Sequence, residues 1–203
     1  MKKPFILALV FLSVLACKKT DEQTTEEVVI PDQLLGDVDA ELLTSQFWNS
    51  YQVALNGQIL TGSITTHGFT IGRIENMSRS PIHSFVISRT TLDADYMAYY
   101  SQRYPRTMPV GKNLTLQAYI KGENLTGEGI SLSIRAEDVN LAPIQVVTTE
   151  GIVSIKGTFD WSPYSVTLTN LPGNITTLYV YLNYHRNTTG TAYFDDITLT
   201  RSQ

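Results

Sequence analysis

Tyrosine, asparagine and arginine side chains recur at alternate positions in the second half of the chain. Along residues 176–185, Tyr179, Tyr181 and Asn183 alternate with aliphatic residues, and Arg135 has the equivalent position in an earlier segment. Successive side chains leave opposite faces of a strand, so these polar residues are expected on an outer face. Tyrosine rings stack on the C–H-rich face of a pyranose, and amide and guanidinium groups bond its hydroxyls. Side chains of these types have the chemistry to bind a sugar where the strands that carry them share one sheet.

The aliphatic residues at the intervening positions predict the core. They are Leu178, Val180 and Leu182 in one segment and Ile130, Leu132 and Ile134 in the other. Tyrosine is also common in strands for packing reasons, and a cross-strand tyrosine pair contributes roughly 0.2–1 kcal/mol without any ligand. The tyrosines alone therefore leave a purely structural role open.

Residue types that carry catalysis do not cluster in this sequence. The three histidines, His67, His83 and His185, lack metal-ligand spacing such as HExxH. Asp195 and Asp196 are adjacent, so on a regular strand they point in opposite directions and make a poor acid–base pair. Neither GxSxG nor a phosphate-binding glycine-rich loop occurs. The sequence therefore predicts that the protein is not an enzyme.

The elements that would position these side chains are strands. Three C-terminal segments alternate apolar with polar residues between turn sequences: 165–171, 176–184 and 191–199. Earlier segments show the same rhythm, and a loop is expected at residues 124–129, between strands at 113–122 and 130–138. We expect an all-β domain, with about nine strands in a two-sheet antiparallel β-sandwich.

Several short motifs between about residues 85 and 200 resemble carbohydrate-binding-module β-sandwiches, which are jelly rolls with a galactose-binding-like topology. The motifs are Trp161, the turn at Pro172-Gly173, the sequence Phe194-Asp195-Asp196-Ile197, the pair Ser101-Gln102, and residues 108–122. In those families a tryptophan opens a strand and an aromatic-Asp-Asp-aliphatic sequence closes the last one. Their N-terminal Asn/Pro/Gly/Phe/Glu signature is missing here.

The resemblance implies which residues meet. In the family's topology the strands at about residues 95–102, 130–137 and 176–184 share one sheet, and the outer face of that sheet is concave. The candidate carbohydrate ligands on this face are Tyr179, Tyr181, Asn183 and Arg135, with Tyr99 or Tyr100 beside them. The same resemblance gives Trp161 mainly a role in the fold.

Asp195 and Asp196 lie where the last strand must change phase. Phe194 and Ile197 can both be buried only if a bulge interrupts the strand between them. A carboxylate beside a core needs a partner, and the resembling families often place a structural Ca²⁺ there. Backbone N–H groups could satisfy the carboxylate equally well, and the N-terminal glutamate that usually adds a calcium ligand is missing.

The start of the chain has the features of a lipoprotein signal. Two lysines precede an apolar run of about a dozen residues, which is shorter than the roughly 20 that span a membrane. Residues 1–16 end in Val-Leu-Ala before Cys17, which resembles a bacterial lipobox and makes Cys17 the expected lipidation site. Residues 17–32 then form an acidic tether and residues 33–203 the folded domain. Lys18 after the cysteine favours the outer membrane, with the domain periplasmic or surface-exposed.

The charge and composition of the chain limit the kinds of partner that the protein could bind. The net charge is −4, or −6 once Lys2 and Lys3 are removed with the signal, which argues against nucleic acid. Together with the resemblance, the sequence predicts a non-catalytic, carbohydrate-binding lipoprotein of a Bacteroidota-type bacterium. The alternative is a structural or adhesive surface lipoprotein that binds another protein.

Overall fold

The computed structural model describes residues 32–42, 47–60, 66–104 and 106–202. Residues 1–31 lie outside this part, so the signal segment, Cys17 and nearly all of the tether do too. The described residues form one 3₁₀ turn and ten strands. The strands are β1 (Trp48–Ala54), β2 (Ile59–Leu60), β3 (Phe69–Glu75), β4 (His83–Arg89), β5 (Tyr96–Tyr104), β6 (Leu114–Glu137), β7 (Pro143–Thr148), β8 (Ile155–Leu168), β9 (Thr177–Tyr184) and β10 (Gly190–Arg201). The predicted all-β class is confirmed.

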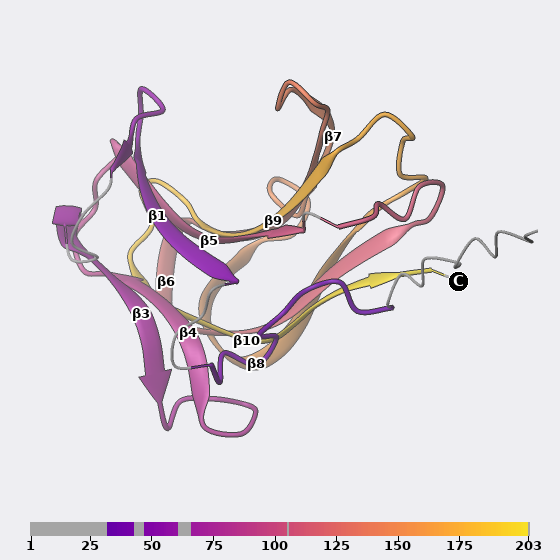
Figure 1. Cartoon of the computed structure of the whole chain (residues 1–203). Coiled ribbons are helices and arrows are strands. Elements are labelled where there is room, and N and C mark those ends of the chain that lie inside the picture. Colours follow the sequence, from indigo (N-terminus) through magenta and orange to yellow (C-terminus); the bar gives the residue numbers. More distant parts are fainter. Residues whose placement is uncertain (1–31, 43–46, 61–65, 105, 203) are drawn as a thin grey trace, which may run out of the picture.

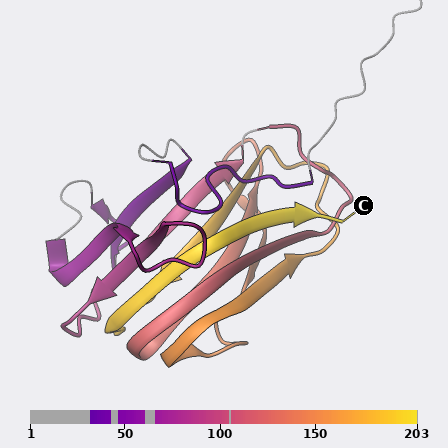
Figure 2. The same cartoon turned by 90° about the horizontal axis from the view of Figure 1, so that it is seen from below.

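The strands form one antiparallel sheet that is curled into two layers, as in a jelly-roll β-sandwich. Their order is β2-β1-β5-β9-β6-β10-β4-β3, and β7 and β8 also pair with β6. The first part of β6 pairs with β8 and β10, and its last part pairs with β7 and β9. Figure 1 shows β1, β5 and β9 above β3, β4, β8 and β10. Figure 2 shows the lower layer, where β4, β10, β6 and β8 lie side by side.

The prediction of two strands separated by a loop at residues 124–129 was wrong, because β6 runs unbroken from Leu114 to Glu137. Its pairing with β8 shifts register three times between Ile120 and Ile130, which is where the strand passes from one layer to the other. Gly127 makes this passage possible. Its φ is +70°, and a Cβ there would overlap the carbonyl oxygen of Asn187.

Strand β8 also begins well before the strand that was expected at residues 165–171. It begins at Ile155, so Trp161 lies inside the strand instead of opening it. Trp161 is only partly buried, and the predicted position of this residue at the start of a strand is therefore corrected.

The core lies between the layers and follows the predicted alternation. Leu178, Val180 and Leu182 of β9 are at most 1% exposed, and the predicted core residues of β6, Ile130, Leu132 and Ile134, are buried too. The opposite layer contributes buried side chains that face them: Leu114, Leu116, Ala118, Ile120, Phe194, Ile197 and Leu199. Because every second residue is committed to this core, the residues between them are directed outward.

We expect Gly127→Ala to destabilise the fold far more than Gly111→Ala. Both glycines have a positive φ, but no atom lies within 4 Å of a Cβ built on Gly111. The control should therefore show only the backbone cost of about 1 kcal/mol, whereas Gly127→Ala adds an overlap that costs roughly 1–3 kcal/mol more. Urea unfolding of both variants measures the difference, and equal losses would show that the close approach at Gly127 is unimportant.

Candidate functional site

The outer face of the upper layer is built from residues that lie opposite one another on neighbouring strands. Three rows cross it: Tyr51, Tyr99, Asn183 and Ser131; then Asn49, Ser101, Tyr181 and Ser133; then Arg103, Tyr179 and Arg135. The structure thus brings five of the six predicted site residues to one face: Tyr99, Arg135, Tyr179, Tyr181 and Asn183.

Tyr100 does not belong to this face, and its placement beside the other candidates was wrong. It is 5% exposed, and its hydroxyl donates a hydrogen bond of 2.6 Å to the carbonyl of Gly72. The reason is the alternation itself: Tyr99 points outward, so Tyr100 must point into the core. Burial raises the pKa of Tyr100 well above its ordinary value.

Four tyrosines form a continuous aromatic surface across β1, β5 and β9. Ring centroids are 5.4 Å apart for Tyr51 and Tyr99, 5.4 Å for Tyr99 and Tyr181, and 6.0 Å for Tyr181 and Tyr179. Sequence reasoning missed Tyr51. The strand-like segment that begins at this residue was the available signal, but nothing local showed that it would pair with Tyr99.

The face is hollowed into a groove made of two adjoining depressions. One has a volume of about 330 Å³ and the other about 350 Å³, and both are lined by Ile59, Tyr99, Arg135 and Tyr181. Asn183 lines the first, and Tyr51 and Tyr179 line the second. Figure 1 shows the turn after β1 and the segment around β7 rising on either side of β5 and β9. These two segments are the walls of the groove.

A chain of buried hydrogen bonds lies under the first depression. The Asn183 amide nitrogen donates to Ser131 Oγ at 3.1 Å and to Ser133 Oγ at 2.9 Å, and Ser131 Oγ also bonds His185 Nε2 at 2.8 Å. Both amide hydrogens of Asn183 are therefore engaged. Among the hydrogen bonds of the described residues none uses its Oδ1, which is the atom left to accept from a ligand.

The charged groups of the groove are paired with each other. Arg135 Nε lies 2.7 Å from a carboxylate oxygen of Glu137, and Glu137 is the one carboxylate among the described residues that line either depression. Burial raises the pKa of Tyr99, and it raises the pKa of Tyr181 to about 12. Both phenols therefore keep their protons at neutral pH. The groove offers flat rings, hydroxyl donors, one amide acceptor and an ion pair.

Asp195 and Asp196 lie on the opposite layer, at the predicted bulge. The register of β10 shifts between Asp195 and Thr198, and Phe194 and Ile197 are both buried as expected. Oδ2 of Asp195 accepts the backbone N–H groups of Arg79 at 2.6 Å and Ser80 at 2.9 Å, while Oδ1 accepts the N–H of Asp196 at 2.8 Å. Burial raises the pKa of Asp195, and these three N–H groups oppose the rise.

This arrangement does not fit a calcium ion. Asp196 pairs with the guanidinium of Arg79 and accepts a hydrogen bond from Ser80 Oγ, so hydrogen-bond donors surround both carboxylates. The described residues include no group of three acidic, histidine or cysteine side chains placed to hold a metal. Backbone and side-chain donors take the place that the resemblance had given to Ca²⁺.

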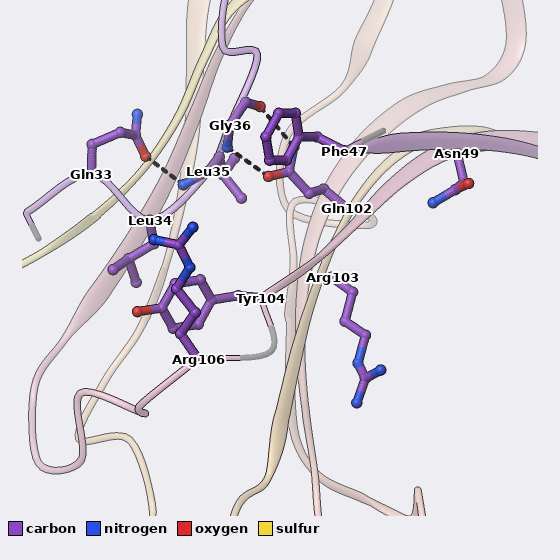
Figure 3. A pocket seen from close by; sticks show the side chains of 10 residues that line it. All are labelled: Gln33, Leu34, Leu35, Gly36, Phe47, Asn49, Gln102, Arg103, Tyr104 and Arg106. Carbon is purple, nitrogen blue, oxygen red and sulfur yellow. Dashed lines mark hydrogen bonds between the residues drawn. The ribbon is translucent and has the colours of Figure 1, made fainter. Parts of the chain in front are cut away.

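A third hollow, of about 420 Å³, lies at the start of β1 and the end of β5, beside the segment 33–36. Figure 3 shows that the guanidinium groups of Arg103 and Arg106 point in different directions there. The side chain of Gln102 is hydrogen-bonded to the backbone of Gly36. Its Oε1 accepts from the Gly36 N–H at 2.7 Å, and its Nε2 donates to the Gly36 carbonyl at 2.9 Å. The polar groups of this hollow do not converge on one point, unlike those of the groove.

Comparison with known proteins gives the fold a context. No family model and no curated protein matches this sequence. The structure is similar to the enzymatically active domain of tailspike protein 4 of bacteriophage CBA120, with a TM-score of 0.62 and 13% identity over 84% of this chain and 22% of that chain. It is similar to a cyclase from Fischerella sp. TAU, with a TM-score of 0.61 and 13% identity over 84% of this chain and 96% of the cyclase chain.

It is also similar to TmCBM61 in complex with β-1,4-galactotriose, with a TM-score of 0.54 and 13% identity over 84% of this chain and 99% of that chain. Carbohydrate-binding modules with a jelly-roll fold are thus among the structural neighbours, as the motifs predicted. This chain spans about a fifth of the tailspike chain and nearly all of the other two. At these identities the likeness shows the fold alone.

The part of the chain that the structure describes contains no helix with the length and apolar character needed to span a membrane.

We expect Asp195→Ala to destabilise the protein by roughly 2–3 kcal/mol, because the N–H groups of Arg79 and Ser80 lose their acceptor. Calcium should not change the result. Thermal unfolding in millimolar CaCl₂ and in EDTA should give the same midpoint for the wild type, and Asp195→Ala should lower that midpoint equally in both. A wild-type midpoint that rises with CaCl₂ and no longer does so in Asp195→Ala would instead place a calcium ion on this carboxylate.

We also expect stability to fall between pH 7.5 and pH 5.5 through His185. Burial lowers the pKa of His185 from 6.5, and the positive charge of Arg186 lowers it further. The negative charges of Glu150 and Glu128 raise this pKa, but the net shift is downward. The unfolded chain therefore takes up a proton near pH 6.5 that the folded chain resists, so stability is lost as the pH falls below that value. His185→Gln should lose less stability than the wild type over this range in thermal unfolding. Equal losses would contradict the assignment.

Proposed function

We propose that this protein is a non-catalytic carbohydrate-binding lipoprotein that captures a glycan in the groove of its upper layer. The observation that carries the proposal is the aromatic surface of Tyr51, Tyr99, Tyr181 and Tyr179 beside the acceptor Oδ1 of Asn183. Rings arranged in this way stack on the apolar faces of successive sugar residues. The ion pair of Arg135 and Glu137 supplies donors and acceptors for ring hydroxyls.

The neighbour solved with β-1,4-galactotriose supports the general choice of carbohydrate as ligand. An oligosaccharide or polysaccharide is the favoured partner because the two depressions share four lining residues and so form one continuous groove. The proposal that the protein is not catalytic rests on the same residues. Glu137 is engaged in the ion pair with Arg135, and neither depression is lined by a second carboxylate from the described residues that could act with it.

The proposed location rests on the sequence alone. Lipidation at Cys17 would anchor the chain to the bacterial outer membrane, and residues 18–32 would hold the domain away from the lipid surface. A glycan-capturing domain on such an anchor would keep its ligand close to the cell.

The test is a glycan array probed with the full-length protein in a non-glycosidic detergent. We expect one polysaccharide class to bind, and Tyr179→Ala/Tyr181→Ala to weaken that binding at least about tenfold through lost ring contacts. Tyr119→Ala is the matched control, because Tyr119 lies on the other layer, opposite Asp195, and it should bind normally.

Absence of binding to every glycan, with the thermal midpoint of the wild type intact, would contradict the proposal. The protein would then be better described as an adhesive lipoprotein that binds another protein. The exposed aliphatic residues around β7 favour that second candidate: Val139, Leu141, Ile144, Val146, Ile152 and Val153.

A further inference from the structure

The first depression has an apolar side that the aromatic surface does not explain. Val53 of β1 lies opposite Ile59 of β2 and opposite Met97 of β5, so the three side chains form one row across neighbouring strands. Val146 of β7 also lines this depression, from its other wall. Ile59 is 50% exposed and Val146 is 55% exposed.

Single exposed aliphatic residues are ordinary on a protein surface. A contiguous row inside a depression is different, because outward positions of a solvated antiparallel sheet are normally polar. The row adjoins the one that contains Tyr99 and Asn183. It therefore extends the proposed binding surface and does not belong to a separate patch.

The two depressions differ in chemistry. Besides the four residues that line both depressions, the second is lined by Tyr51, Ser101, Glu137, Leu141 and Tyr179. The first combines four aliphatic or thioether side chains with the amide of Asn183, whose Oδ1 is left as an acceptor. An apolar wall beside a hydrogen-bond acceptor fits a group that carries a methyl and an N–H donor close together.

We propose that the first depression binds the acetamido group of an N-acetylated sugar. The methyl group packs between Val53 and Val146, and the amide N–H donates to Oδ1 of Asn183. The remaining sugar residues stack on Tyr181 and Tyr179 in the second depression. This inference rests on the proposed function, since it names the class of glycan that the same groove selects.

The test uses glycan pairs that differ only in the acetamido group. The full-length protein is titrated with N-acetylchitohexaose and cellohexaose, which share the β-1,4 linkage and carry no charge. An array of paired N-acetylgalactosamine and galactose glycans, and of paired N-acetylglucosamine and glucose glycans, covers the other linkages. In the pair that the protein binds best, we expect the acetamido glycan to bind about tenfold more tightly than its hexose partner. The difference comes from one buried methyl group and one added hydrogen bond.

Val53→Thr/Val146→Thr tests the apolar wall directly. Threonine keeps the branched shape and strand preference of valine but replaces a methyl group with a hydroxyl. We expect the variant to bind acetamido glycans about fourfold more weakly and to lose less affinity for their hexose partners, so that the preference for acetamido glycans falls. Val139→Thr is the matched control, because Val139 is 76% exposed and lines neither depression. It should leave both affinities unchanged.

The outcomes separate this inference from the proposed function. If glycans bind, and Tyr179→Ala/Tyr181→Ala abolishes the binding, but the hexose members bind as tightly as their acetamido partners, the acetamido inference is wrong and the proposed function stands. A preference for acetamido glycans that the double valine variant retains would also overturn it. Absence of binding to any glycan would overturn both.

Discussion

The groove depends on a single constraint, which is that β6 must hydrogen-bond in both layers of the sandwich. Its first part holds β8 and β10, and its last part holds β9 and β7. In the part of β6 that passes between the layers, Gly127 comes so close to the backbone of Asn187 that no side chain would fit there. This crossing sets the register of β6 against β9, and that register places Arg135 opposite Tyr179 and Ser131 opposite Asn183.

The buried hydrogen bonds beneath the groove then orient its polar groups. Ser131 is completely buried, and its hydroxyl is hydrogen-bonded to both Asn183 and His185. Each such bond stabilises the fold by about 1 kcal/mol, and leaving a buried partner unsatisfied costs more. The amide of Asn183 is therefore held with its oxygen available, before any ligand arrives. Preorganisation of this kind lowers the entropy cost of binding.

The comparisons show how widely one architecture can be used. A phage tailspike domain, a cyclase and a galactotriose-binding module have similar backbones at 13% identity to this chain. A shared fold does not fix the function, which depends on the side chains of each protein's own site. In this chain the lining of the groove is a ladder of tyrosines with an ion pair at one end and an aliphatic row at the other.

Much of this could be predicted from the sequence, because strand alternation is a local property. The outward set of Tyr179, Tyr181 and Asn183 follows from the neighbouring leucines and valine. The bulge at Asp195 and Asp196 follows similarly, because Phe194 and Ile197 could not both be buried on a regular strand. The same alternation of apolar and polar residues, repeated along the chain, was sufficient to predict the all-β class.

Partners that are distant in the sequence were decided only by the tertiary structure. Tyr51 joins the aromatic surface because β1 pairs with β5, and Val146 reaches the first depression because β7 pairs with β6. The acceptors of Asp195 are occupied by Arg79 and Ser80, more than a hundred residues earlier. Alternation tells which way a side chain points but not which strand lies beside it. That depends on the register of the sheet and on where a glycine lets the chain cross. The sequence therefore determined the outward-facing residues of each strand, and the tertiary structure assembled them into a groove.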